Sequence, residues 1–91
     1  KEKEIACKIF KGLQLGVSYL IAGGTRVSKL KTLIIKYWSK EKKIKLEYLD
    51  VVDFDSFNTI KTVTKKSVIC CAVFIGKNRL IDNLVFCPKS N

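Results

Sequence analysis

Four cysteines, Cys7, Cys70, Cys71 and Cys87, are the side chains best suited to bind a metal or form disulfides. Their spacing matches neither a zinc ribbon nor a Cys-x-x-Cys pair, and the absence of histidine excludes mixed cysteine and histidine zinc sites. Cys70 and Cys71 are neighbours in an expected strand, so they point to opposite faces and cannot readily share a metal. We interpret all four as reduced, partly buried thiols of a cytoplasmic protein, since no secretory leader is recognisable.

Three carboxylates, Asp50, Asp53 and Asp55, stand at positions i, i+3 and i+5 and could attract a hard cation. A calcium loop needs further oxygen ligands and a turn glycine, which this stretch lacks, so we interpret the three as turn formers. The sequence has no glycine-rich phosphate loop, and without histidine it has neither a Ser/His/Asp constellation nor the usual general base near neutral pH. We therefore predict no catalytic, cofactor-binding or metal-ligating residues.

The charge balance is strongly basic, because 18 lysines and arginines face 8 aspartates and glutamates and give a formal net charge of +10. Only Arg26 and Arg79 are arginines, the residue that reads phosphate forks and guanine edges, so the basic surplus is weakly specific. A solvated charged face is the commoner explanation, and a free-standing basic module that binds nucleic acid is the alternative. The lysine clusters that could follow a phosphate backbone are at positions 40, 42, 43, 65 and 66.

The length of the chain limits the number of domains that it can form. A chain of 91 residues that is 47% hydrophobic suits one compact domain, with a radius of gyration of about 12 Å. The longest uninterrupted apolar run is the eight residues 68–75, far short of the ~20 that a helix needs to cross a bilayer. We expect no membrane span.

Residues 5–21 follow the period of an amphipathic helix. Gly23 and Gly24 are expected to end it, because glycine adopts the left-handed conformation that closes a helix. No capping residue precedes Ile5, so we expect the helix to begin at or beyond the first residue and the chain to be part of something longer. The expected apolar half consists of Ile5, Ala6, Ile9, Phe10, Gly12, Leu13, Gly16, Val17, Leu20 and Ile21.

Three positions of this helix, two glycines and one leucine, allow predictions about what packs against it. Gly12 and Gly16 each cost up to ~1 kcal/mol relative to alanine, so we expect a neighbouring element to pack closely against both. Leu15 falls in the middle of the polar side. It is either an ordinary exposed leucine or part of a surface that a partner covers.

A second helix is expected from Ser28, its predicted N-cap, with one buried face. That face contains Leu30, Leu33, Ile34, Tyr37 and Trp38. A strand is expected over residues 44–52, with either a bulge or burial on both faces near Tyr48 and Leu49, where the alternation slips. Residues 53–58 are expected to turn, and Phe57, Ile60 and Val63 to form a short edge segment.

The last part of the chain predicts a hairpin. Residues 68–75 form its most buried strand, residues 76–78 the turn, and residues 80–86 the antiparallel partner. Two helices followed by about three strands, without β-α-β alternation, predict an α+β fold with the two helices on one face of a small antiparallel sheet. We expect residues 1–91 to form a single domain.

The polar residues of this hairpin carry a family resemblance. The run Arg79, Leu80, Ile81, Asp82 and Asn83 closely resembles the C-terminal signature of the pantothenate synthetase (pantoate-beta-alanine ligase) family. The likeness covers about residues 3–86. It includes residues 5–20 as the first helix of the family's C-terminal domain, Ala22 and Gly23 as its turn, residues 46–57 as a strand, and residues 68–75 as the core strand.

The resemblance implies the C-terminal domain of an ATP-dependent ligase. The family makes pantoyl adenylate from pantoate and ATP, with Mg, and lets β-alanine displace AMP to give pantothenate. Its nucleotide-binding N-terminal domain precedes the region matched here and is not expected in this chain. The smaller domain closes over the active site and excludes water, so we expect this chain to be inactive alone. The parent enzyme is expected to be a cytoplasmic homodimer.

On this resemblance Arg79, Asp82, Asn83 and Leu15 are candidate interdomain or structural residues. Asp82 and Asn83 must point to opposite faces of their strand and cannot form one compact site. Direct contact with the other domain is one role for them. The other is local, with Asp82 paired nearby and Asn83 bonded to a turn.

Overall fold

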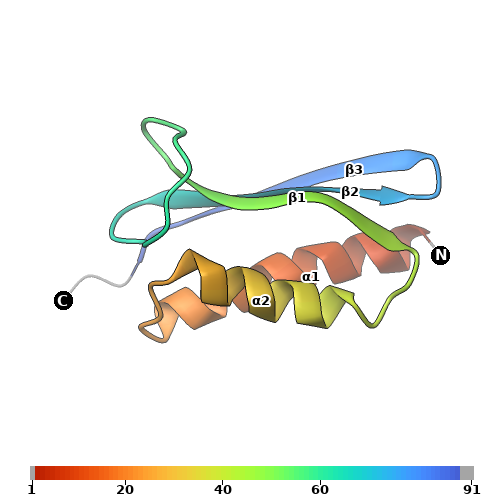
Figure 1. The fold of residues 1–91 in the computed structure, drawn as a ribbon, viewed down its shortest axis with the longest axis horizontal. Helices are drawn as coiled ribbons and strands as arrows, with labels where there is room; N and C mark the ends of the chain where they lie inside the picture. The colour runs from red at the N-terminus through yellow and green to blue at the C-terminus, as the bar shows by residue number, and fades with distance from the viewer. Residues whose placement is uncertain (1, 89–91) are drawn as a thin grey trace.

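Two helices lie side by side on one face of a three-stranded antiparallel sheet (Figure 1). The computed structural model describes residues 2–88. Its elements are α1 (Glu2–Ile21), α2 (Val27–Trp38), β1 (Ile44–Asp53), β2 (Ser67–Ile75) and β3 (Asn78–Phe86). The strand order is β1-β2-β3, so β2 is central, and no helix of the described residues covers the second face. The α+β prediction is confirmed.

The core lies between the helix layer and the sheet, and the apolar period of each element accounts for it. Its fully buried apolar side chains come from every element except β3: Ile9, Leu13, Leu30, Ile34, Val51, Ile69, Cys71 and Val73. The radius of gyration is 12.9 Å, close to the value expected from the length. Within residues 2–88 no helix combines the length and the apolar character that crossing a membrane requires.

The end of α1 follows the glycine prediction. Gly23 has a φ of 105°. Its N–H donates to the carbonyl of Leu20 at 3.1 Å, and the N–H of Gly24 donates to the carbonyl of Tyr19 at 3.0 Å. These two bonds are the Schellman arrangement that satisfies the last carbonyls of a helix.

The apolar half of α1 is narrower than predicted. Phe10 and Ile21 were expected on it, but both are exposed, Ile21 at 54%. They lie at the border of the stripe, and the contact with α2 and the sheet does not reach that far around the helix. Gly12 and Gly16 do lie under neighbours, as expected, because a Cβ on Gly12 would meet the ring of Trp38 and one on Gly16 would meet Ile34.

The predicted N-cap of the second helix was wrong. The cap is Arg26, which makes no side-chain cap bond, and Ser28 lies inside α2, where its carbonyl accepts a bond from the Thr32 hydroxyl. The chain enters α2 through tertiary bonds instead, because the N–H of Val27 donates to the carbonyl of Lys61 at 2.9 Å. Leu33, expected on the buried face, is also exposed.

The slip in β1 is a bulge. Leu46 pairs with Val73 and Tyr48 with Ala72, so Glu47 between them has no partner on β2. The edge segment expected around Phe57, Ile60 and Val63 is not a strand. Two isolated bridges, one joining Val52 to Thr59 and one joining Arg26 to Thr62, hold this stretch instead.

The hairpin between β2 and β3 is tighter than predicted. Ile75 pairs directly with Asn78, which leaves only Gly76 and Lys77 in the loop. Gly76 has a φ of 61° at the first loop position, the arrangement of a type II′ turn, whose twist suits paired strands. The register of the whole hairpin follows from this loop.

Candidate functional site

Successive side chains of each strand point to opposite faces of the sheet. One face contacts the two helices, and we call the opposite one the helix-free face. Ile69, Cys71 and Val73 of β2 belong to the core under the helices. Their neighbours along β2, and the residues paired with those neighbours, therefore point the other way. The helix-free face consists of Lys45, Tyr48, Asp50 and Val52 of β1, Val68, Cys70, Ala72 and Phe74 of β2, and Arg79, Ile81, Asn83 and Val85 of β3. Glu47, in the bulge of β1, joins this face through its bonds to Arg79.

Arg79 crosses this face to reach Glu47. Its Nε donates to Oε1 at 2.7 Å and its second guanidinium nitrogen to Oε2 at 3.1 Å, a bidentate pair that joins the two edge strands over β2. The bulge is what makes Glu47 available, since that residue has no partner on β2. The hydrogen bonds from Arg79 hold the pKa of Glu47 below its ordinary value, against the opposing effect of desolvation.

The structure brings only two of the four candidate residues to one face. Asn83 shares the helix-free face with Arg79, whereas Asp82 is paired with buried Cys71 and points to the helix side. The Asp82 carboxylate accepts the N–H of Asn83 at 2.8 Å. Leu15 lies on α1 in the other layer and is 39% exposed. The four therefore do not form one site.

The four cysteines are free thiols. Cys70 and Cys71 lie on opposite faces of β2, as predicted. Burial first, and the nearby Asp82 carboxylate second, raise the pKa of Cys71 to about 11, so its thiol is not a nucleophile near neutral pH. Nowhere in residues 2–88 do three or more potential ligands gather to hold a metal ion.

Asp53 organises the turn after β1, which confirms its interpretation as a turn former. Its carboxylate accepts the N–H of Asp55 at 3.3 Å and the hydroxyl of Ser56 at 3.0 Å, and it lies 3.2 Å from Lys65 Nζ. Burial alone would raise the pKa of Asp53, but these bonds together lower it. The result is a turn held by side-chain contacts.

Phe57 is the residue that this turn presents, and its role was missed in the sequence. It is 70% exposed, with a φ of 60°, and its N–H donates to the carbonyl of Asp53 at 2.8 Å. A left-handed conformation is rare for a bulky residue. The only signal in the sequence was an aromatic residue within a polar turn, which also suited a strand.

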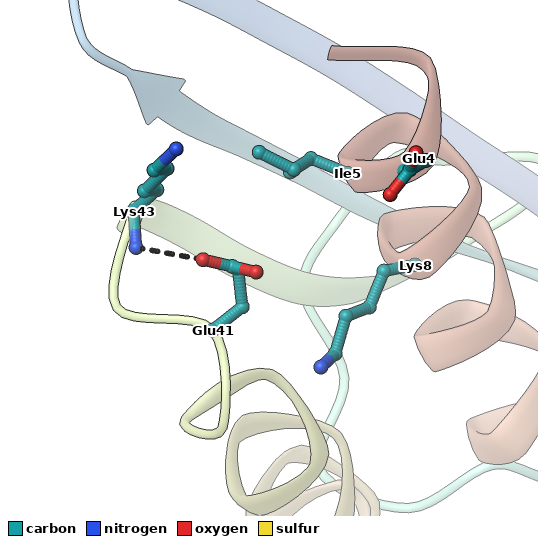
Figure 2. A pocket seen from close by; sticks show the side chains of 5 residues that line it. All are labelled: Glu4, Ile5, Lys8, Glu41 and Lys43. Atoms are coloured by element: carbon teal, nitrogen blue, oxygen red, sulfur yellow. Dashed lines mark hydrogen bonds between the residues drawn. The ribbon is translucent and has the colours of Figure 1, made fainter. Parts of the chain in front are cut away.

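An open hollow of about 400 Å³ lies between the start of α1 and the segment before β1 (Figure 2). Its lining is Glu4, Ile5, Lys8, Glu41 and Lys43. One oxygen of Glu41 accepts the N–H of Lys43 at 3.3 Å, the dashed line in Figure 2. The charges are mixed in sign and come from segments far apart in the chain, so sequence spacing could not have shown the hollow.

The glycines before α2 do not form a phosphate site. The first amide of the helix, that of Val27, is bonded to Lys61, and the carbonyl of Thr25 accepts the N–H of Val63 at 2.8 Å. A phosphate at a helix N-terminus needs free amides aimed at it. The Val27 amide is therefore not free to bind a phosphate.

Comparisons with known proteins identify similar chains. A family model described as pantoate-beta-alanine ligase matches residues 1–85. The pantothenate synthetase of Caldicellulosiruptor saccharolyticus is 38% identical over 84 residues, which make up 92% of this chain and 30% of that protein. That of Clostridioides difficile is 33% identical over 86 residues, 94% of this chain and 30% of that protein.

Solved structures agree on the fold. The crystal structure of pantothenate synthetase from Thermus thermophilus matches with a TM-score of 0.82 at 18% identity, over 91% of this chain and 30% of that one. The chain thus spans about 30% of the length of the relatives that it matches. These matches do not favour the alternative of a free-standing nucleic-acid-binding module.

Proposed function

The chain belongs to the pantoate-beta-alanine ligase family, and we propose that it is the C-terminal domain of a pantothenate synthetase, a ligase that joins pantoate to β-alanine. The observation that carries this proposal is the family match over residues 1–85, which corresponds to 30% of the relatives' length. A single domain over residues 1–91 is part of the same proposal.

The chemistry is assigned to the rest of the enzyme. The described residues include no metal cluster, and the cysteine most deeply buried has its pKa raised to about 11. ATP with Mg, pantoate and β-alanine are proposed to bind mainly to a nucleotide-binding domain outside this chain. A cytoplasmic location, a place in coenzyme A biosynthesis and a homodimeric parent enzyme complete the proposal.

The role of this chain is to cover the reacting groups. A lid excludes water from an activated acyl group while an amine attacks it, and that role requires a stable surface rather than a nucleophile. The two packed layers supply such a surface. Arg79 and Asn83 are assigned to the side that faces the other domain, and Asp82 and Leu15 to structural roles.

A replacement experiment tests the proposal. The segment of the Caldicellulosiruptor saccharolyticus enzyme that matches this chain is exchanged for residues 1–91, and pantothenate and AMP are both measured. We expect the chimera to form pantothenate with nearly one AMP for each product. The same enzyme truncated before the segment is expected to release AMP with little pantothenate, because water then reaches the activated acyl group.

The isolated chain is the control for both hypotheses. It should form no pantothenate and release no AMP. Nucleic-acid binding by the isolated chain, falling steeply as salt rises, would support the alternative function, since counterion release drives such binding. An inactive chimera that folds as well as the parent enzyme would contradict the proposed function.

A further inference from the structure

The sheet has two edge strands, and they differ in how they are protected. An exposed edge presents a row of unpaired N–H and C=O groups to which another strand can add. On β1 the bulge at Glu47 interrupts this row, and the segment after the strand covers its far end, where the N–H of Ile60 donates to the carbonyl of Val51 at 3.0 Å. β3 pairs with β2 on one side, and within residues 2–88 no strand lies beyond it.

β3 is a long and regular edge strand. Its nine residues pair with β2 without a register shift, and none of them is proline or lysine, two residues that commonly block an edge. Two of its side chains are apolar and exposed, Ile81 at 59% and Val85 at 46%. Such an edge favours association with another strand unless something prevents it.

The hairpin loop determines which groups of β3 point outward. Ile75 and Asn78 flank the two-residue loop, and the pair that flanks such a loop is hydrogen-bonded. Bonded and non-bonded pairs alternate along an antiparallel ladder, so every second residue after Asn78 directs its N–H and C=O away from β2. We call these residues the outer edge: Arg79, Ile81, Asn83 and Val85.

The carboxylate of Asp82 occupies the outer edge near its middle. The N–H of Asn83 donates to Asp82 Oδ1 at 2.8 Å, so this N–H is already bonded within the chain. A hydrogen bond to a carboxylate is stronger than one between two neutral groups. Another strand that pairs with Asn83 must therefore break a strong bond before it can form its own.

A second copy of β3 would match the outer edge in one antiparallel register. With Asn83 on the two-fold axis, Asn83 pairs with the same residue of the second copy, and Ile81 pairs with Val85 of the second copy. All of these are outer-edge residues, so both pairs would be hydrogen-bonded in the new ladder. An axis at Asp82 would instead place two carboxylates directly opposite each other, which is unfavourable. Apart from Asp82, the edge is self-complementary.

We propose that Asp82 protects the β3 edge, and that without its carboxylate a second copy of the chain adds to this edge and joins the two sheets into one. The carboxylate acts in two ways. It holds the N–H of Asn83, and in the register centred on Asn83 the two Asp82 carboxylates would lie at diagonal positions, where like charges repel. This role concerns the association of the chain with itself and does not depend on the ligase activity.

The test compares Asp82→Ala with the original chain of 91 residues by sedimentation equilibrium. Removing the bond to a charged group should tighten association by roughly ten-fold for each copy, and so by about a hundred-fold for the dimer. The matched control is Asp55→Ala, which removes the same charge from an exposed position of the turn after β1 and should associate as weakly as the original chain. Both variants raise the net charge from +10 to +11, so charge alone would weaken association.

A second substitution locates the contact. Ile81→Pro, added to Asp82→Ala, removes an N–H of the outer edge without removing a bond to β2, and should return the chain to weak association. Circular dichroism shows whether each variant is folded. In the original chain, hydrogen exchange measured by nuclear magnetic resonance should show the Asn83 amide exchanging roughly five-fold more slowly, or slower still, than the amides of Ile81 and Val85, each relative to its intrinsic rate.

Several results would overturn the inference. One is a folded Asp82→Ala chain that associates no more tightly than the original. Another is equal association of Asp55→Ala and Asp82→Ala, and a third is a dimer that survives Ile81→Pro, which would place the contact elsewhere. If Asp82→Ala does not fold, the exchange rates decide, because equal relative rates for Asn83, Ile81 and Val85 would show that the carboxylate does not hold the edge.

Discussion

The contact between Gly12 and Trp38 gives the sharpest test of the helix layer. Alanine in a helix interior is favoured over glycine by about 1 kcal/mol, so propensity alone predicts that Gly12→Ala stabilises the chain. In the structure, however, a Cβ at position 12 would lie 2.2 Å from Trp38 Nε1 and 2.7 Å from Cε2. Trp38 is buried, and its Nε1 donates to the carbonyl of Lys8 at 3.1 Å. The indole therefore cannot move without losing that bond.

The expected size of the effect follows from these contacts. Overpacking costs about 1–3 kcal/mol and the lost hydrogen bond about 1 kcal/mol, against the gain of about 1 kcal/mol in propensity. We expect Gly12→Ala to lower the free energy of unfolding by about 1–3 kcal/mol and the melting temperature by roughly 5–20 °C. Urea and thermal unfolding followed by far-ultraviolet circular dichroism measure both quantities.

Two further variants separate the clash from other causes. In Gly16→Ala the nearest atom is the flexible Cδ1 of Ile34 at 2.8 Å, so we expect a smaller loss. Trp38→Phe should cost less in the Gly12→Ala background than in the original chain, because the smaller ring relieves the overlap. A chain that gains about 1 kcal/mol on Gly12→Ala would refute the close approach of the helices.

Three other predictions concern single groups. Folding lowers the pKa of Asp53, so the ionised carboxylate stabilises the folded chain above its ordinary pKa of 3.8, and this stabilisation is lost as the pH falls through the lower folded-state pKa. The difference in free energy of unfolding between the original chain and Asp53→Asn, measured in urea, should therefore shrink as the pH falls below 3.8. A difference that stays constant with pH would contradict this prediction. Iodoacetamide at pH 8 should modify Cys7 and Cys87 but spare Cys71 in the native protein, as peptide mapping can show, and early labelling of Cys71 would count against its burial. Gly76→Ala should lower stability by about 1–2 kcal/mol, and Gly76→Asn by less, since asparagine tolerates a positive φ; equal losses in urea unfolding would argue against the turn.

The helices and strands were predictable from the sequence because the spacing of their apolar residues matches the spacing of the residues that are buried. The helical period of residues 5–21 and the apolar run of residues 68–75 both reflect packing on the core, and the glycine pair after α1 ends the helix as local rules require. The slip at Tyr48 predicted an irregularity. Only the register showed that it was a bulge.

The failures have tertiary causes. Ser28 suits an N-cap by local propensity, but the bond from Val27 to Lys61, a residue more than thirty positions away, decides where α2 begins. Phe57 suits a strand by propensity, yet the bonds of Asp53 hold it in a left-handed turn. The pairing of Arg79 with Glu47 depends on a bulge in another strand, which no local pattern of residues near Arg79 contains.

For the candidate site residues, the sequence predicted only what the alternation of side chains along a strand determines without ambiguity. Alternation alone separates Asp82 from Asn83, and the register confirms that separation. What alternation could not tell is which of the two points toward the helices, because β2 is apolar on both of its sides. That ambiguity has a physical origin: the strand carries the pattern of a sheet with two cover layers, and the helices are one of them. The packing of the helices on Ile69, Cys71 and Val73, together with the register, is what places Asp82 on the helix side and Asn83 on the other.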